Sequence, residues 1–163
     1  TFAGNATFNG SIIFEGSTAD ANETTLTVAD PTADRTITLP DATTTVAGLA
    51  VVQSFTKAQR GTPVALTDGA TIAVDLSLGN NFSVTLGGNR TLGAPTNQTA
   101  GQSGVIVVTQ DGTGSRTLAY NSVYKFAGGT APTLTTTASA VDVLAYYVES
   151  STRITVTSLL NVS

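Results

Sequence analysis

The stretch that decides the fold runs from Thr71 to Leu86 and reads TIAVDLSLGNNFSVTL. Its apolar residues alternate with small or polar residues on both sides of a Gly79-Asn80 turn, and they are Ile72, Val74, Leu76, Leu78, Phe82, Val84 and Leu86. Strict alternation over this length is typical of strands that bury one face and expose the other. The stretch therefore predicts two half-buried strands and an all-β fold.

Further strands are predicted on the C-terminal side of this stretch. The run Val105–Val108 is continuously aliphatic, which predicts a strand covered on both faces. Turn signals at short spacing separate it from strands predicted at Thr117–Tyr120, Val141–Val148 and Ile154–Val156. About eight strands over roughly 100 residues are the pattern of a β-sandwich. We expect residues 63–163 to form a jelly-roll-like β-sandwich domain.

Residues 1–50 contain short strands separated by glycine and proline turns. Two of them, Thr24–Val28 and Arg35–Leu39, predict a hairpin. One face of this hairpin carries only four aliphatic side chains, Leu26, Val28, Ile37 and Leu39. Since an isolated two-stranded hairpin is at best marginally stable, we expect other copies of the chain to cover these four residues as an oligomer interface. Residues 1–50 are thus predicted to be a shaft-like segment intertwined between chains, and residues 51–62 a junction.

The composition excludes many kinds of function. His and Cys are absent, which removes the commonest general base, the thiol nucleophile and both usual zinc ligands. The net charge is −4 and the seven basic residues are scattered, which argues against nucleic-acid binding. The apolar run Val46–Val52 is too short to cross a membrane. We predict no catalytic residues, no metal and no cofactor, no nucleic-acid partner and no membrane insertion.

Two arrangements of acidic residues could carry chemistry. Asp30, Asp34 and Asp41 surround Arg35, and clustered carboxylates can ligate calcium. However, Asp before Pro is a common turn residue, and Asp34 can pair with Arg35. A glycosidase would need two carboxylates held across a scissile bond, but most acidic residues here sit beside Gly, Pro or Ser in turns. Turn formation therefore explains the acidic residues better than calcium or catalysis.

The tyrosines are the best candidates for a receptor contact. Aromatic faces with nearby amides and hydroxyls suit stacking on sugars, and we predict such a contact at Tyr120, Tyr124 and Tyr146. The alternative is that these rings belong to the core. Tyr146 and Tyr147 are adjacent in a strand and must face opposite ways, so at least one of them is expected to be buried.

Two segments of the chain resemble a known family. Residues 10–42, GSIIFEGSTADANETTLTVADPTADRTITLPDA, resemble a module of tail-fibre and other fibre-like virion proteins of tailed bacteriophages, particularly those that infect marine cyanobacteria. The segments SFTKAQRGTPVAL, GQSGVIVVTQDGTGSRTLAY and VDVLAYYVESSTRITV resemble the compact domain that often follows that module. The resemblance implies a homotrimeric, β-rich fibre part with a structural function, and host-surface attachment at the tip in some members.

We therefore interpret the chain as a non-enzymatic structural part of a phage appendage, such as a tail fibre, head fibre or spike. Its expected partners are two further copies of itself, other virion proteins and, at a tip, a host surface glycan, and its expected location is the virion surface. Only one shaft-like unit is visible, so we expect a short appendage or an excised end rather than a complete long fibre. The chain begins at Thr1 rather than Met, so we expect a processed product or a fragment. The alternative is a self-polymerising extracellular filament subunit, in which the N-terminal strands complete the sheet of the next copy.

Overall fold

A computed structural model describes residues 11–38, 41, 52 and 54–162 of the chain. The chain divides into two compact units, Thr1–Gln53 and Ser54–Ser163, which are described separately below. Strands dominate the C-terminal unit, and the described part of the N-terminal unit has one short strand pair. The helical elements of the described residues are two single-turn 3-10 helices, η1 (Leu76–Leu78) and η2 (Ala127–Gly129). The predicted all-β class is confirmed.

In the N-terminal unit, β1 (Ile12–Phe14) pairs antiparallel with β2 (Thr24–Leu26), and Ile12 lies opposite Leu26. The predicted hairpin between 24–28 and 35–39 is wrong, because β2 pairs with β1 and the described residues 35–38 form no strand. Local hydrogen bonds explain the preference: within the connection, the Asn22 N–H donates to the Asp20 carboxylate at 2.7 Å. This turn brings β2 back onto β1 before the chain reaches Pro31.

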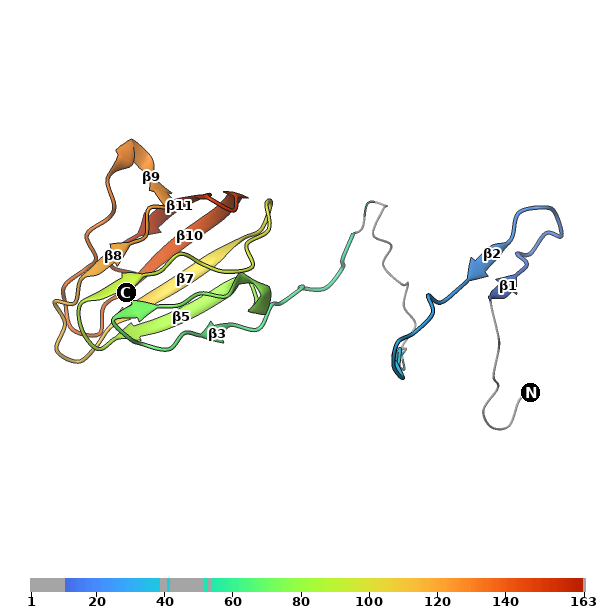
Figure 1. The fold of residues 1–163 in the computed structure, drawn as a ribbon, viewed down its shortest axis with the longest axis horizontal. Coiled ribbons are helices and arrows are strands. Elements are labelled where there is room, and N and C mark those ends of the chain that lie inside the picture. The colour runs from blue at the N-terminus through green and yellow to red at the C-terminus, as the bar shows by residue number, and fades with distance from the viewer. Residues whose placement is uncertain (1–10, 39–40, 42–51, 53, 163) are drawn as a thin grey trace. The chain divides into compact units, whose positions relative to one another are not determined.

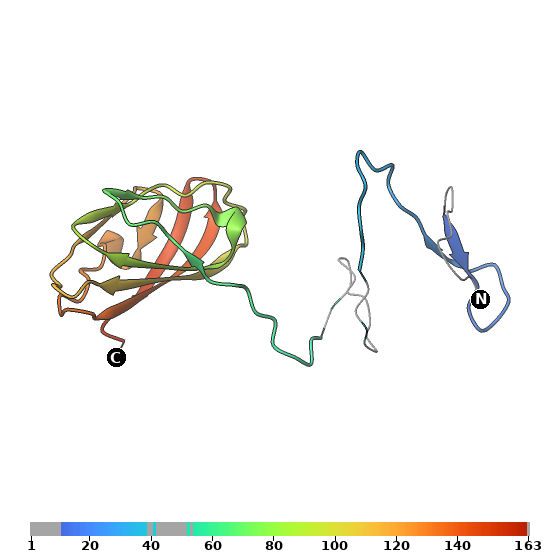
Figure 2. The same cartoon turned by 90° about the horizontal axis from the view of Figure 1, so that it is seen from below.

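The C-terminal unit contains a six-stranded and a three-stranded sheet (Figures 1 and 2). The six-stranded sheet has the order β3 (Val64–Ala65), β5 (Asn81–Leu86), β7 (Ser103–Gln110), β10 (Val141–Ser150), β11 (Arg153–Leu159) and β9 (Tyr124–Phe126). The three-stranded sheet has the order β4 (Thr71–Ile72), β6 (Arg90–Leu92) and β8 (Leu118–Tyr120).

The first six strands of this unit alternate between the two sheets. β3, β5 and β7 are parallel neighbours in the larger sheet, and β4, β6 and β8 are parallel neighbours in the smaller one. The chain therefore winds three times through both sheets, and we call β3 to β8 the parallel stack. β10 and β11 then add an antiparallel hairpin beside β7. A jelly roll is not confirmed, because the sheets of a jelly roll are built from antiparallel Greek keys, whereas β3 to β8 pair in parallel within their sheets.

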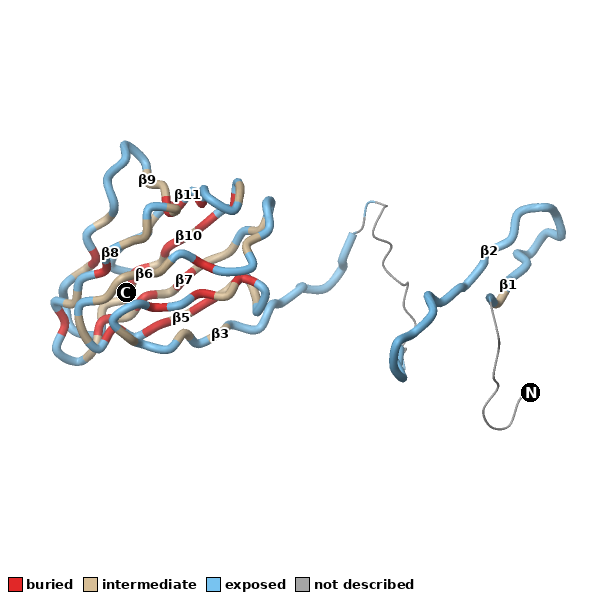
Figure 3. The backbone as a smooth tube through the Cα atoms, viewed as in Figure 1, coloured by how far each residue is buried: buried red, intermediate tan, exposed pale blue. Residues whose placement is uncertain are grey.

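Both sheets contribute to one hydrophobic core. Ile72, Leu92 and Leu118 come from the three-stranded sheet. On the larger sheet, Phe82, Ile106 and Leu144 lie opposite one another on neighbouring strands, and all three are buried. Figure 3 shows buried positions alternating with more exposed ones along these strands, as expected for sheets packed on one face. The two sheets thus enclose the core from opposite sides.

Two of the predicted strands differ in detail. The stretch 71–78 forms a strand only as far as Ile72, because the Asp75 side chain accepts hydrogen bonds from the backbone and hydroxyl of Ser77 and caps η1. The run 105–108 is covered on one face: Ile106 and Val108 are buried, whereas Val105 and Val107 remain half-buried on the other face. The prediction of coverage on both faces is therefore wrong within a single chain.

Candidate functional site

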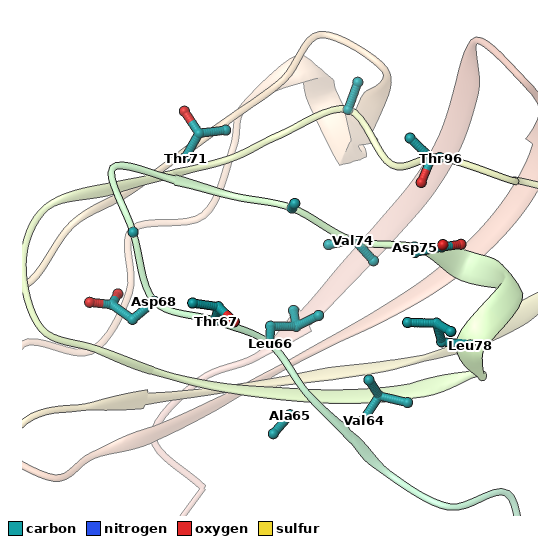
Figure 4. A pocket seen from close by; sticks show the side chains of 13 residues that line it. Val64, Ala65, Leu66, Thr67, Asp68, Thr71, Val74, Asp75, Leu78 and Thr96 are labelled. Atoms are coloured by element: carbon teal, nitrogen blue, oxygen red, sulfur yellow. The ribbon is translucent and has the colours of Figure 1, made fainter.

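A groove of about 350 Å³ lies at the first winding of the parallel stack (Figure 4). Apolar side chains from β3 and from the segment after β4 line it, together with threonines, and they include Val64, Leu66, Val74, Leu78, Thr67, Thr71 and Thr96. β3 and β4 are the outermost strands of their sheets, and within the described ranges no further strand pairs with their outer edges. The groove is therefore the open end of the stack.

Asp68 stands on one side of this groove, in an ion pair with Arg90. The guanidinium donates two hydrogen bonds to the carboxylate, at 2.8 and 2.6 Å. These bonds, helped by the backbone N–H of Gly87, hold the pKa of Asp68 below its usual value. This bidentate ion pair joins the loop before β4 to the start of β6, so Asp68 has a structural role in the isolated chain.

Asp75 is the second carboxylate of the groove. Asn97 donates to it at 2.8 Å, and Ser77 donates from both its backbone and its hydroxyl. These hydrogen bonds lower the pKa of Asp75, and the bond from Asn97 has the largest effect. A general acid must be protonated near the working pH, and both carboxylates of the groove stay ionised there. Neither carboxylate of the groove is therefore suited to act as a general acid.

Two carboxylates elsewhere in this unit, Asp111 and Glu149, also have lowered pKa values. Arg116 donates two hydrogen bonds to Asp111, at 3.0 and 2.7 Å, and lowers its pKa. Glu149 accepts hydrogen bonds from the Thr155 hydroxyl and from Arg153. Both lower the pKa of Glu149, and the bond from Thr155 has the larger effect. Each of these acidic groups has partners of its own from a neighbouring turn or strand.

The structure places the three predicted receptor tyrosines in or beside the core. Tyr124 and Tyr146 are each only 6% exposed. The Tyr124 hydroxyl donates to the Gly93 carbonyl at 3.1 Å, and the Tyr146 hydroxyl donates to the Asn80 carbonyl at 3.0 Å. Burial raises the pKa of both, that of Tyr146 to about 12. Neither ring offers a face for a sugar to stack on in this arrangement.

Tyr120 packs edge-on against both Phe126 and Tyr124, with ring centroids 4.8 and 6.4 Å away. It keeps partial exposure, but its hydroxyl is buried and has no hydrogen-bond partner among the described residues. The expectation that Tyr146 and Tyr147 face opposite ways is confirmed, since Tyr147 is 50% exposed on the other side of β10. Sequence alternation alone does not show which of Tyr146 and Tyr147 is exposed, because that depends on which face of β10 packs against the core.

The predicted interface residues of the N-terminal unit do not form one face of a hairpin. Leu26, Val28 and Ile37 are 56%, 67% and 83% exposed, and only Leu26 lies in a strand. Leu39 falls outside the described residues. The role of these four side chains as an oligomer interface remains a prediction.

The described residues contain neither a cluster of metal ligands nor a membrane-spanning helix. Within 11–38, 41, 52 and 54–162, no three or more acidic side chains gather as a metal site would require. In the same part of the chain, no helix has the length and apolar character needed to span a membrane.

Residues 65–149 match the family described as "Putative phage tail fibre C-terminal domain". The match covers more than half of the 163 residues, from Ala65 in β3 at the open end of the stack to Glu149 in β10. The chain belongs to this family. No curated protein and no solved structure matches the chain. Membership confirms the resemblance to tail-fibre proteins and indicates a structural role as a component of a phage virion. The groove at β3 and β4 and the tyrosine cluster are therefore features of a tail fibre domain.

Proposed function

We propose that this chain is a non-enzymatic structural part of a phage appendage at the virion surface, built from three copies. In it, residues 1–50 form the intertwined segment and residues 63–163 the compact domain. Its partners are other virion proteins and, where the domain forms a tip, a host surface glycan. Membership of the tail fibre domain family supports the structural role.

The proposal that copies of the chain associate is supported by the exposure of apolar side chains in the N-terminal unit. Among its described residues, Ile12 alone is partly buried, and apolar Ile13, Phe14, Leu26, Val28 and Ile37 are each more than half exposed. Ordering a residue's backbone costs roughly 1–2 kcal/mol, and a segment that buries so little apolar surface cannot offset this by itself. Contact between copies of the segment would supply the missing burial.

The absence of enzymatic activity is supported by the carboxylates. Asp68, Asp75, Asp111 and Glu149 all have lowered pKa values and are held by neighbouring donors. A carboxylic acid that protonates a glycosidic oxygen needs a raised pKa instead. For the glycan contact, Tyr120 is the member of the predicted trio that keeps partial exposure, and the proposed contact therefore rests on it.

Mass measurement tests the proposal most directly. Native mass spectrometry and multi-angle light scattering of the full chain at micromolar concentration should return three times the 16.5 kDa of one chain, without larger species. A stable monomer would overturn the proposed association. Incubation with host envelope polysaccharide should release no reducing sugar.

The filament alternative is favoured by one observation, the open edges of β3 and β4 beside the groove. An edge strand with a hydrophobic groove next to it can accept an extended segment from another copy. Such contacts are heterologous and do not close, so a filament would appear as a series of masses that lengthens with concentration. Negative-stain images would show strings of domains instead of uniform particles.

A further inference from the structure

The outer face of the six-stranded sheet is apolar at its centre. Alternation along the strands places six side chains on this face, opposite to the core: Val105, Val107, Val143, Ala145, Tyr147 and Leu159. The strand register brings Val107, Val143 and Leu159 into one row across β7, β10 and β11. Leu159 is 64% exposed and Tyr147 50%, while Val107 and Val143 are half-buried, so the face is partly open in the single chain.

The chain beyond β11 adds two more exposed apolar side chains close to this face. The Val162 N–H donates to the Val141 carbonyl at 2.8 Å, which holds the C-terminal residues beside the start of β10. Leu160 and Val162 are 43% and 47% exposed. Large apolar surface left open on a soluble β protein marks an interaction site or an aggregation hazard.

The distribution of charge favours a second copy of the chain as the partner. On the outward positions of β5, β7, β10 and β11, the charged residues are Glu149 and Arg153, which neutralise each other in an ion pair at 2.7 Å near the β10–β11 turn. The chain as a whole carries a net charge of −4, so two copies repel each other over most of their surface. The central sheet face is where identical copies can approach without bringing like charges together.

The area of this sheet face limits how much of an interface it can form. Four strands spaced about 4.8 Å apart, with about seven residues each rising 3.4 Å, give a flat area on the order of 450 Å². A standard interface commits about 800 Å² from each partner. The face is therefore large enough to form part of a stable contact between copies.

We infer that the outer face of the six-stranded sheet, which carries the row Val107, Val143 and Leu159, packs against a second copy of this chain. The inference rests on the proposed association of copies and adds the surface through which the compact domains meet. It also accounts for the continuous aliphatic run 105–108, since both faces of β7 are then covered.

Cysteine accessibility tests this surface, because the chain contains no cysteine of its own. Leu159→Cys places a thiol at the exposed end of the row that Val107, Val143 and Leu159 form, and Ala119→Cys places one at an exposed position of β8 in the other sheet as the matched control. In the assembled full chain, maleimide should label Cys at 159 at least about ten times more slowly than at 119. Equal labelling rates in an assembled protein would overturn the inference and leave the proposed association standing.

A charge at the same place gives a second measurement. Val143→Glu should lower the mass of the assembly at micromolar concentration, whereas Ala119→Glu should leave it unchanged, with circular dichroism used to check that both variants keep their strands. An unchanged mass for a folded Val143→Glu variant would overturn the inference. A monomeric wild-type chain would overturn both the inference and the proposed association, and protection of Cys at 159 in such a monomer would mean that the chain covers the face itself.

Discussion

The hydroxyl of Tyr146 donates a hydrogen bond to the carbonyl of Asn80 across the gap left by Gly104. Tyr146 lies opposite Gly104 in the register of β10 and β7. The same Asn80 carbonyl accepts a hydrogen bond from Val105 at 3.0 Å, so it joins the η1–β5 turn to both strands. A Cβ at position 104 would overlap the Asn80 carbonyl and lie 2.9 Å from the Tyr146 hydroxyl.

Gly104→Ala is therefore expected to destabilise the C-terminal unit by roughly 3 kcal/mol, because the atom it would meet belongs to the backbone and cannot rotate away. Urea denaturation followed by circular dichroism measures this loss. Gly112→Ala is the matched control, since a Cβ there meets nothing within 4 Å, and its free energy of unfolding should change by less than about 0.5 kcal/mol. Similar stabilities for the two variants would contradict the close approach at Gly104.

The buried hydroxyl of Tyr120 predicts a stabilising substitution. It has no hydrogen-bond partner among the described residues, and an unpaired buried polar group costs about 1–3 kcal/mol. Tyr120→Phe should therefore raise the free energy of unfolding by about 1 kcal/mol. Tyr124→Phe, which removes the hydrogen bond to Gly93, should lower it by about the same amount. Equal signs for the two neighbouring variants would show that the Tyr120 hydroxyl is satisfied.

Asp142 is expected to be the most sensitive carboxylate of the chain. It is 1% exposed and accepts hydrogen bonds from the backbone and hydroxyl of Thr135 and from the backbone of Asn161. Asp142→Ala leaves these donors without partners and should cost about 3 kcal/mol or more in a thermal or urea melt. Asp20→Ala, at an exposed turn of the N-terminal unit, is the control and should leave that melt unchanged within about 0.5 kcal/mol. Comparable effects of the two substitutions would contradict the structural role of Asp142.

Sequence patterns predicted the strands better than their partners. The alternation at 81–86 corresponds to β5, and the runs at 105–108 and 141–148 lie in β7 and β10. The parallel pairing was missed because Val64, Phe82 and Ile106 are neighbours across the sheet but are separated by unequal loops, so no repeat is visible in the sequence. An antiparallel sandwich was the simpler interpretation of closely spaced turns.

The candidate sites depended on facts that local patterns do not contain. Which of two adjacent tyrosines is buried depends on which face of β10 meets the core, and packing of the three-stranded sheet decides this. The groove at β3 and β4 arises only because these strands are outermost in their sheets. Without the sheet order, the residues between 64 and 78 could be interpreted only as strands and a turn.

Stability should be constant across neutral pH and fall on both sides. The pKa values of Asp68 and Asp111 are lowered by Arg90 and Arg116, so their contribution is complete above the ordinary carboxyl pKa of about 4 and is lost as pH falls through the folded values. Burial raises the pKa of Tyr146 to about 12, while an unfolded tyrosine ionises near pH 10, so this contribution is complete below pH 10 and is lost above it.

Melting temperatures measured from pH 2 to 11 should accordingly be flat between about pH 5 and 9, where no His is present to titrate. Asp68→Asn should make the acid side of this profile shallower, and the conservative Tyr146→Phe should do the same on the alkaline side. A clear change in melting temperature between pH 6 and 8 would mean that some other group titrates there.

The two units should differ in their ability to fold alone. Residues 54–163 contain every residue of the buried apolar core, from Ile72 to Val156, and should form a cooperatively melting β domain when expressed by themselves. Among the described residues of 1–53 there is one short pair, β1 with β2, whose side chains are exposed apart from partly buried Ile12. Because burial that small cannot offset roughly 1–2 kcal/mol of backbone entropy per residue, the isolated piece should lack a cooperative transition as a monomer. Fusing it to an unrelated trimeric coiled coil raises the local concentration of its copies and should restore β structure. Far-ultraviolet circular dichroism of the two pieces and of the fusion provides the measurement. A monomeric N-terminal piece that melts cooperatively, or a fusion that stays unstructured, would mean that contact between copies is not what orders this segment.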